Sequence, residues 1–145
     1  MKNLVLTLIA VFCLIACEKE ERQAEQFSWV GEWNATNIVI NDTLQTIPIF
    51  QQGTILKYIS ITIPEGDSGE IEGKTFKNGM GFDFKLMMEN QIEFEFYGGT
   101  KREEDKWGTA FSEIILDTKS FQVDAVNLSF YDINNKLIIL FTKPQ

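Results

Sequence analysis

Met80-Gly81-Phe82-Asp83-Phe84-Lys85-Leu86-Met87-Met88 alternates large apolar side chains with mostly small or polar ones. Successive side chains of a β-strand point to opposite faces, so this period predicts a strand with one buried face. Residues 92–97 repeat the pattern, with Ile92, Phe94 and Phe96 on the apolar face. The two segments are therefore predicted to form a hairpin that turns at Glu89-Asn90.

The same alternation continues in both directions from this hairpin and predicts an all-β fold after Trp29. Asn78-Gly79 is the preferred pair for a type I′ turn, and Asn134-Asn135 is expected to turn the chain before the last strand. Residues 44–50, which contain Pro48, are left open as a lid, a loop or an edge strand. We place eight strands at residues 32–40, 54–63, 69–77, 80–88, 91–97, 108–117, 120–131 and 136–143.

Eight sequential antiparallel strands favour an up-and-down barrel, because closure removes the exposed edges of an open sheet. A sandwich of a six-stranded and a two-stranded sheet would show the same alternation and remains an alternative to the barrel. Residues 98–106 carry balanced charges and are predicted to form a solvated loop between the fifth and sixth strands. No strong helix is expected.

Composition excludes several classes of function. The chain of 145 residues has 13 basic and 21 acidic side chains and a formal net charge of −8, which argues against a nucleic-acid partner. It contains no histidine, the commonest general base and metal ligand, and only two cysteines. We therefore expect no metal site, no cofactor and no enzymatic activity.

The first residues resemble an export signal. Lys2 precedes an uncharged apolar run, residues 4–16, which is too short to cross a bilayer as a helix. The run ends in Leu14-Ile15-Ala16-Cys17, which resembles the bacterial lipobox, in which the chain is cut before a cysteine that receives a diacylglyceryl group. The resemblance implies a signal peptide at residues 1–16 and lipidation at Cys17, which would leave the mature chain without a free thiol.

Residues 17–28 are expected to be the acylated cysteine and a charged tether. Glu18-Lys19-Glu20-Glu21 is similar to the surface-export signal of lipoproteins in one group of Gram-negative bacteria. A solvated charged spacer without targeting meaning is the alternative. The expected location is the outer membrane, through a lipid anchor, with exposure at the cell surface or in the periplasm both open.

Residues 29–145 resemble the lipocalin-like bacterial lipoproteins. Gly31-Glu32-Trp33 matches the Gly-x-Trp motif of lipocalins, which implies that Gly31 allows close approach and that Trp33 closes the base of the barrel. The late arginine that stacks on this tryptophan in lipocalins has no counterpart, because the chain's arginines are Arg22 and Arg102.

Local motifs for catalysis have simpler explanations. Gly66-Asp67-Ser68-Gly69 resembles a serine-protease motif but has no histidine to activate it, so a turn is expected. Asp132 with its neighbouring asparagines lacks the spaced carboxylates of a calcium loop. The strand carboxylates Glu93 and Glu95 alternate with apolar residues and should face solvent.

The barrel interior is the remaining candidate site. An eight-stranded barrel either fills with its own side chains or holds one small ligand. Two functions follow: binding of a small hydrophobic molecule inside the barrel, or a filled barrel that binds a protein as an inhibitor, immunity or envelope-assembly factor. The ligand-pocket candidates are Phe82, Phe84, Met88, Phe94, Phe96 and Phe111.

Overall fold

The computed structural model describes residues 28–87, 90–100 and 102–145. The predicted signal peptide, Cys17 and nearly all of the tether lie outside the described residues. Among the residues that the structure describes, no helix combines the length and apolar character that crossing a membrane requires.

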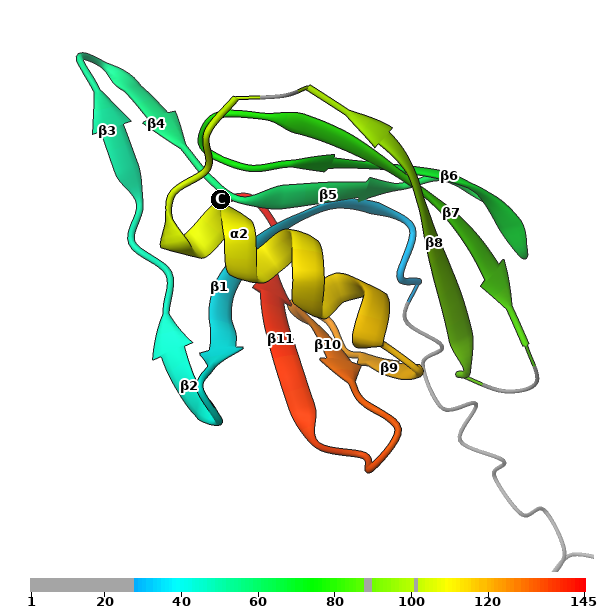
Figure 1. Ribbon diagram of the computed structural model, residues 1–145. Coiled ribbons are helices and arrows are strands. Elements are labelled where there is room, and N and C mark those ends of the chain that lie inside the picture. The colour runs from blue at the N-terminus through cyan, green and yellow to red at the C-terminus, as the bar shows by residue number, and fades with distance from the viewer. Residues whose placement is uncertain (1–27, 88–89, 101) are drawn as a thin grey trace, which may run out of the picture.

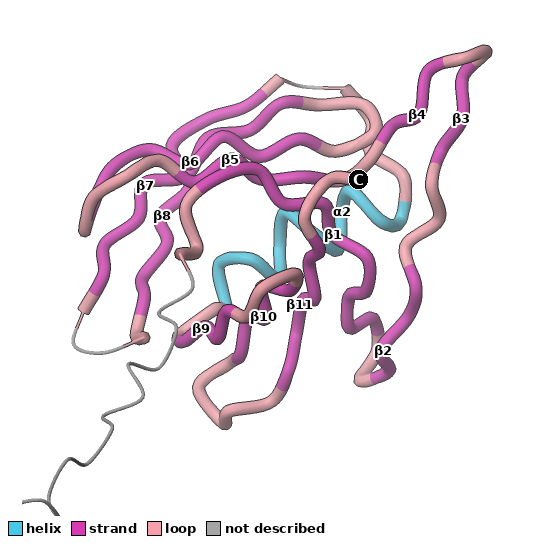
Figure 2. The backbone as a smooth tube through the Cα atoms, turned by 180° about the vertical axis from the view of Figure 1, so that it is seen from behind, coloured by secondary structure: helices cyan, strands magenta, loops and turns pink. Residues whose placement is uncertain are grey.

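The fold is mostly antiparallel β-structure, as the alternation predicted, and the described residues also contain one short helix that it did not predict (Figure 1). The main sheet follows the order β8-β7-β6-β5-β1-β11-β10-β9, and β2 pairs with the end of β1. A separate hairpin, β3–β4, projects from the body in both views (Figures 1 and 2). The strands are β1 (Gly31–Ile40), β2 (Thr43–Thr46), β3 (Phe50–Gln52), β4 (Ile55–Lys57), β5 (Ser60–Ile63), β6 (Ser68–Lys74), β7 (Gly79–Leu86), β8 (Ile92–Gly99), β9 (Ser120–Val123), β10 (Asn127–Tyr131) and β11 (Leu137–Thr142).

The hairpin predicted from residues 80–97 is confirmed. Strands β7 and β8 pair from Leu86↔Ile92 to Met80↔Gly99, with a register shift next to Phe82. Phe82 and Phe84 are buried, whereas Asp83 and Lys85 are exposed. Glu89 of the predicted turn lies outside the described residues.

The predicted strand at residues 108–117 is wrong. These residues form helix α2 (Lys106–Ile114) and a 3-10 turn (Ile115–Asp117). Asp105 caps the helix by accepting hydrogen bonds from the backbone N–H groups of Trp107 (2.9 Å) and Gly108 (3.0 Å). Helix α2 packs against β1, and the 3-10 turn packs against β8. Helical structure therefore takes the position in which a strand was predicted.

The predicted closed eight-stranded barrel is not found. Strands β8 and β9 are the two ends of the sheet and meet only at one bridge, Gln91↔Ser120. The backbone bonds Ile92 N to Lys119 O (3.0 Å) and Phe121 N to Asn90 O (2.9 Å) hold this contact. Residues 106–117, between β8 and β9, are helical and add no strand between them, so the sheet stays open beyond the bridge.

Two other predicted strands are each divided into two strands in the structure. The predicted strand 54–63 contains both β4 and β5, and 120–131 contains β9 and β10 separated by a turn at Asp124. The carboxylate of Asp124 accepts from the side-chain amide of Asn127 and from the backbone N–H of Val126 and Asn127, both backbone bonds at 2.8 Å. The amide bond, followed by the two backbone bonds, lowers the pKa of Asp124. An aspartate that satisfies nearby backbone donors in this way favours a turn over a continuous strand.

The turn predicted at Asn78-Gly79 is also different. Neither residue has a positive φ, so this is no type I′ turn. The loop is closed one step earlier, where Thr75 N donates to Asn78 O at 2.8 Å and Asn78 N donates to Thr75 Oγ1 at 2.9 Å. Gly79 is consequently the first residue of β7.

Candidate functional site

The interior of the curved sheet is packed with aromatic rings. Phe82, Phe84 and Phe111, three of the predicted pocket residues, are 0%, 3% and 0% exposed. Ring contacts connect β7, β8, β10, β11 and α2 across this space, with centroid separations of 5.0 Å to 6.4 Å: Phe82–Phe94, Phe94–Phe130, Phe130–Phe141 and Phe111–Phe141. These residues serve as the core of the domain.

Two other predicted pocket residues, Phe94 and Phe96, lie on the edge strand β8. Phe94 is half-buried, and Met88 lies outside the described residues. Phe96, expected to point inward, is 49% exposed because β8 is an end strand with no neighbour on its outer side. Its ring still meets Phe82 edge-on at 5.8 Å.

Gly31 and Trp33 occupy the positions that the Gly-x-Trp resemblance emphasised. Gly31 has φ +122°, a conformation that a side chain would strain. Trp33 is 0% exposed, and its indole Nε1 donates to the carbonyl of Trp29 at 2.7 Å. The ammonium of Lys143 lies 5.5 Å from the Trp33 ring centroid, so a late cation does approach this ring.

A groove of about 430 Å³ lies on the outer face of the sheet, beneath the projecting hairpin β3–β4, which we call the arm. Asn34, Ser60, Lys74 and Gly79 form its floor, because the strand register places them in one cross-strand row over β1, β5, β6 and β7. Thr62 shares this face and is exposed, yet Ser60 is only 7% exposed. The base of the arm and the β6–β7 turn form the sides, through Leu56, Lys57, Tyr58, Thr75, Phe76, Lys77 and Asn78, and Glu32 completes the lining.

The arm and the segments that flank it are apolar and almost uncharged. From Thr43 to Pro64, a range that includes the arm, the sequence contains one charged residue, Lys57. The Phe50 ring contacts the Phe76 ring at 5.8 Å and connects the arm to the β6–β7 turn. Four large side chains of the arm remain half or more exposed: Ile49, Phe50, Ile55 and Leu56. Two strands alone are marginally stable in water, so the Phe50–Phe76 contact helps to hold the arm over the groove.

One side of the groove is fixed by a buried carboxylate. Glu104 Oε1 accepts from the hydroxyl of Thr75 (2.6 Å) and from the amide of Asn78, both groove-lining residues. The Asn78 side chain also bonds the carbonyl of Arg102 (2.8 Å) and the hydroxyl of Thr100 (2.9 Å). The other oxygen of Glu104 is buried without a hydrogen-bond partner among the described residues, and it lies where a Cβ on Gly108 would be. The segment predicted to be a solvated loop is thus tied to the β6–β7 turn.

Replacing Glu104 with alanine is expected to lower the free energy of unfolding by about 2 kcal/mol, because the donors of Thr75 and Asn78 lose their acceptor. Glu104→Gln retains a carbonyl acceptor and should lose less. Urea unfolding measures both, and Glu103→Ala, at the exposed neighbour, is the matched control. Equal stability of the Glu104→Ala and Glu103→Ala chains would contradict a structural role for this carboxylate.

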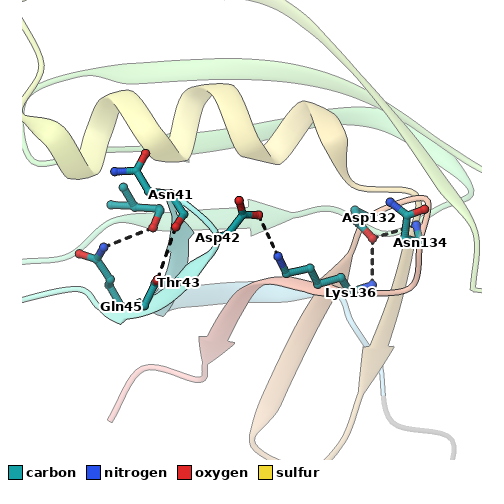
Figure 3. A network of polar contacts seen from close by, with 8 residues as sticks. Asn41, Asp42, Thr43, Gln45, Asp132, Asn134 and Lys136 are labelled. Carbon is teal, nitrogen blue, oxygen red and sulfur yellow. Dashed lines mark hydrogen bonds and ion pairs between the residues drawn. The ribbon is translucent and has the colours of Figure 1, made fainter.

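Two further cavities are weaker candidates for a functional site. One of about 340 Å³ lies beside the groove and includes Phe96, Gly98 and Glu104. The other, of about 290 Å³, lies between the β1–β2 and β10–β11 turns, and Figure 3 shows the polar contacts of three of its lining residues, Asp42, Asp132 and Lys136. There Lys136 pairs with Asp42 at 3.1 Å.

The polar groups in Figure 3 stabilise turns. Asp132 accepts from the backbone N–H of Asn134 (2.9 Å) and of Lys136 (2.8 Å), and its pKa is lowered, chiefly by the latter bond. Asn41 and Asp42 both adopt positive φ in the β1–β2 turn. Within the described ranges, no group of three or more His, Cys, Asp or Glu side chains is arranged to hold a metal ion.

The groove residues were missed by the sequence analysis. Lys57, Lys74 and Lys77 belong to no motif, and Tyr58 and Phe76 lie at strand ends. Only the alternative that residues 44–50 form a lid pointed toward the arm. Comparisons with protein-family models, with curated proteins and with solved structures found no match. Function is therefore inferred from the geometry of the chain itself.

Proposed function

We propose that the protein is a lipid-anchored envelope lipoprotein that binds a small hydrophobic molecule without catalysis, and that the binding site is the groove beneath the arm. The observation that carries this proposal is the groove itself, about 430 Å³ in volume, with apolar side chains on both sides and polar groups on its floor. Mostly apolar concave sites with a few placed polar groups are typical of small-molecule binding.

The packed interior supports a site on the outer face. Phe82, Phe111 and Phe130 are fully buried and contact other rings across the space that a hollow barrel would leave for a ligand. Opening that space would separate these contacts, whereas a ligand in the groove leaves the core unchanged. We therefore propose that the small molecule binds in the groove beneath the arm instead of in the interior.

The location follows from Cys17 and the segment before it. Lipidation at Cys17 anchors the chain to the outer membrane, and residues 17–28 act as the tether, with surface exposure favoured by Glu18-Lys19-Glu20-Glu21. A non-catalytic role fits the strand carboxylates, because Asp83, Glu93 and Glu95 are all exposed to solvent rather than enclosed as a reactive pair.

The test compares native and denatured masses of the full-length protein purified from its own envelope. A bound small molecule should appear as a discrete extra mass in the native spectrum. Gly79→Phe should remove it, because Gly79 lines the groove and an added Cβ there enters open space. Gly98→Phe is the matched control, since Gly98 lines only the neighbouring cavity. Retention of the extra mass in Gly79→Phe would overturn the assignment of the site.

A second candidate function is binding of a protein partner through the arm. The exposed Ile49, Phe50 and Ile55 favour it, because apolar clusters on a projecting element mark interaction surfaces. The same mass comparison separates the two functions. A small molecule adds a mass far below that of a protein, whereas a partner adds the mass of a polypeptide.

A further inference from the structure

The groove carries positive charge in a negatively charged protein. Lys57, Lys74 and Lys77 line it, and Glu32 is the only acidic residue among its lining. The whole chain has 21 acidic and 13 basic side chains, so random placement would favour acidic residues here. The three lysines come from the arm, from the end of β6 and from the β6–β7 turn, and the fold brings them to one opening.

These lysines are not neutralised within the described part of the chain. The ion pair found there joins Lys136 to Asp42, on a different cavity. Glu72 is two residues before Lys74 on the same strand face, yet the two side chains form no ion pair. Three unpaired ammonium groups around a concavity attract an anion, and the attraction is larger where the groove walls exclude water.

Beside the lysines, the same groove presents apolar surface. Leu56 on the arm, Tyr58 at its base and Phe76 on the β6–β7 turn all line the cavity, and Phe76 is 8% exposed. Leu56 is 50% exposed and Phe76 is held by the Phe50 ring. A ligand that satisfies both kinds of lining has an apolar body and an acidic group.

We propose that the groove binds an acidic amphiphile, with its acid group among Lys57, Lys74 and Lys77 and its apolar part between Leu56 and Phe76. This rests on the proposed function and specifies the ligand class. The acid group is a carboxylate or a phosphate, since an ammonium recognises either as a point charge.

The test uses two fluorescent probes that share an aromatic amine body, anilinonaphthalene sulfonate and the uncharged phenylnaphthylamine. All described elements lie within residues 29–145, so the chain from residue 17 with Cys17→Ala is used, which keeps acyl chains and detergent out of the titration. The sulfonate probe should bind at least about tenfold more tightly than the uncharged probe, and the difference should shrink as salt screens the lysines.

Two variants with equal charge change locate the effect. The triple variant Lys57→Gln, Lys74→Gln, Lys77→Gln should remove the preference for the sulfonate probe. Lys85→Gln, Lys119→Gln, Lys136→Gln, none of which lines the groove, should keep it. Displacement of the sulfonate probe by decanoate and by decyl phosphate, with decanol as the uncharged control, distinguishes the two acid groups.

The outcomes separate the ligand class from the site. If both probes bind equally and ignore the groove lysines, but Gly79→Phe weakens both, the acidic ligand is overturned and the groove stands. If Gly79→Phe weakens neither probe, the groove itself is overturned as the binding site. A sulfonate preference that persists in the groove triple variant and falls in the other triple would place the anion elsewhere and contradict the proposal.

Discussion

Replacing Trp33 with alanine is expected to lower the free energy of unfolding by about 4 kcal/mol, the range for removing a buried tryptophan. Trp33 is fully buried at the start of β1, the central strand that pairs with β5 on one side and β11 on the other. The change removes the ring from the core and leaves the carbonyl of Trp29 without the indole donor at 2.7 Å. Because domains have a net stability of only about 5–15 kcal/mol, this one change should approach global unfolding.

Two variants of the same residue type test the mechanism. Trp33→Phe keeps most of the apolar volume and loses the hydrogen bond, so it should cost about 1–2 kcal/mol. Trp107→Ala, on the half-buried start of α2, should cost about 1 kcal/mol. Denaturant unfolding of the three chains should therefore order them Trp33→Ala, Trp33→Phe, Trp107→Ala from the largest loss to the smallest. If Trp33→Ala lowered the free energy of unfolding less than Trp107→Ala does, Trp33 would not hold the sheet together.

The hairpin of β7 and β8 was predictable because its two faces differ in chemistry. Phe82 and Phe84 pack inward while Asp83 and Lys85 remain in water, and a one-residue slip would reverse both. Strands with this contrast specify their own register. The open edge was less predictable, because Phe96 has the apolar character of a core residue but lies on an end strand.

Helix α2 had a signal in the sequence that the alternation obscured. Trp107, Ala110, Phe111, Ile114 and Ile115 have the three- and four-residue spacing of one helix face, and Asp105 precedes them as an N-cap. The prediction of a strand at residues 108–117 does not take account of this spacing. With a helix there, the predicted barrel lacks the strand that would close it.

The groove depends on long-range pairing that local patterns do not contain. Asn34, Ser60 and Lys74 meet because β1, β5 and β6 are neighbours in the sheet, although the sequence separates them widely. Glu104 is placed by hydrogen bonds from Thr75 and Asn78, and its neighbours in sequence, Glu103 and Asp105, are also acidic, so the sequence does not single it out. A site built from single residues of several elements becomes visible only when the register is known.

Cys17→Ala is expected to abolish acylation of the chain completely. The thiol of Cys17 is the proposed nucleophile that takes the diacylglyceryl group, and alanine has no atom that replaces it. Each buried methylene contributes about 0.8 kcal/mol to membrane binding, and a single chain anchors only marginally, so losing all chains at one residue removes the anchor. The measurement is incorporation of a labelled fatty acid into the immunoprecipitated protein, together with its presence in the outer-membrane fraction.

Cys13→Ala is the matched control, because Cys13 is the only other cysteine and belongs to the proposed signal peptide, residues 1–16. It should incorporate the label and reach the outer membrane as the unaltered chain does. The groove should be unaffected by Cys17→Ala, since every residue that lines it belongs to the strands and turns from Glu32 to Gly79. Probe binding should therefore persist after the anchor is lost, which makes anchoring and binding separable properties of one chain. Label that remains in Cys17→Ala, or disappears in Cys13→Ala, would contradict lipidation at Cys17 and with it the proposed place in the envelope.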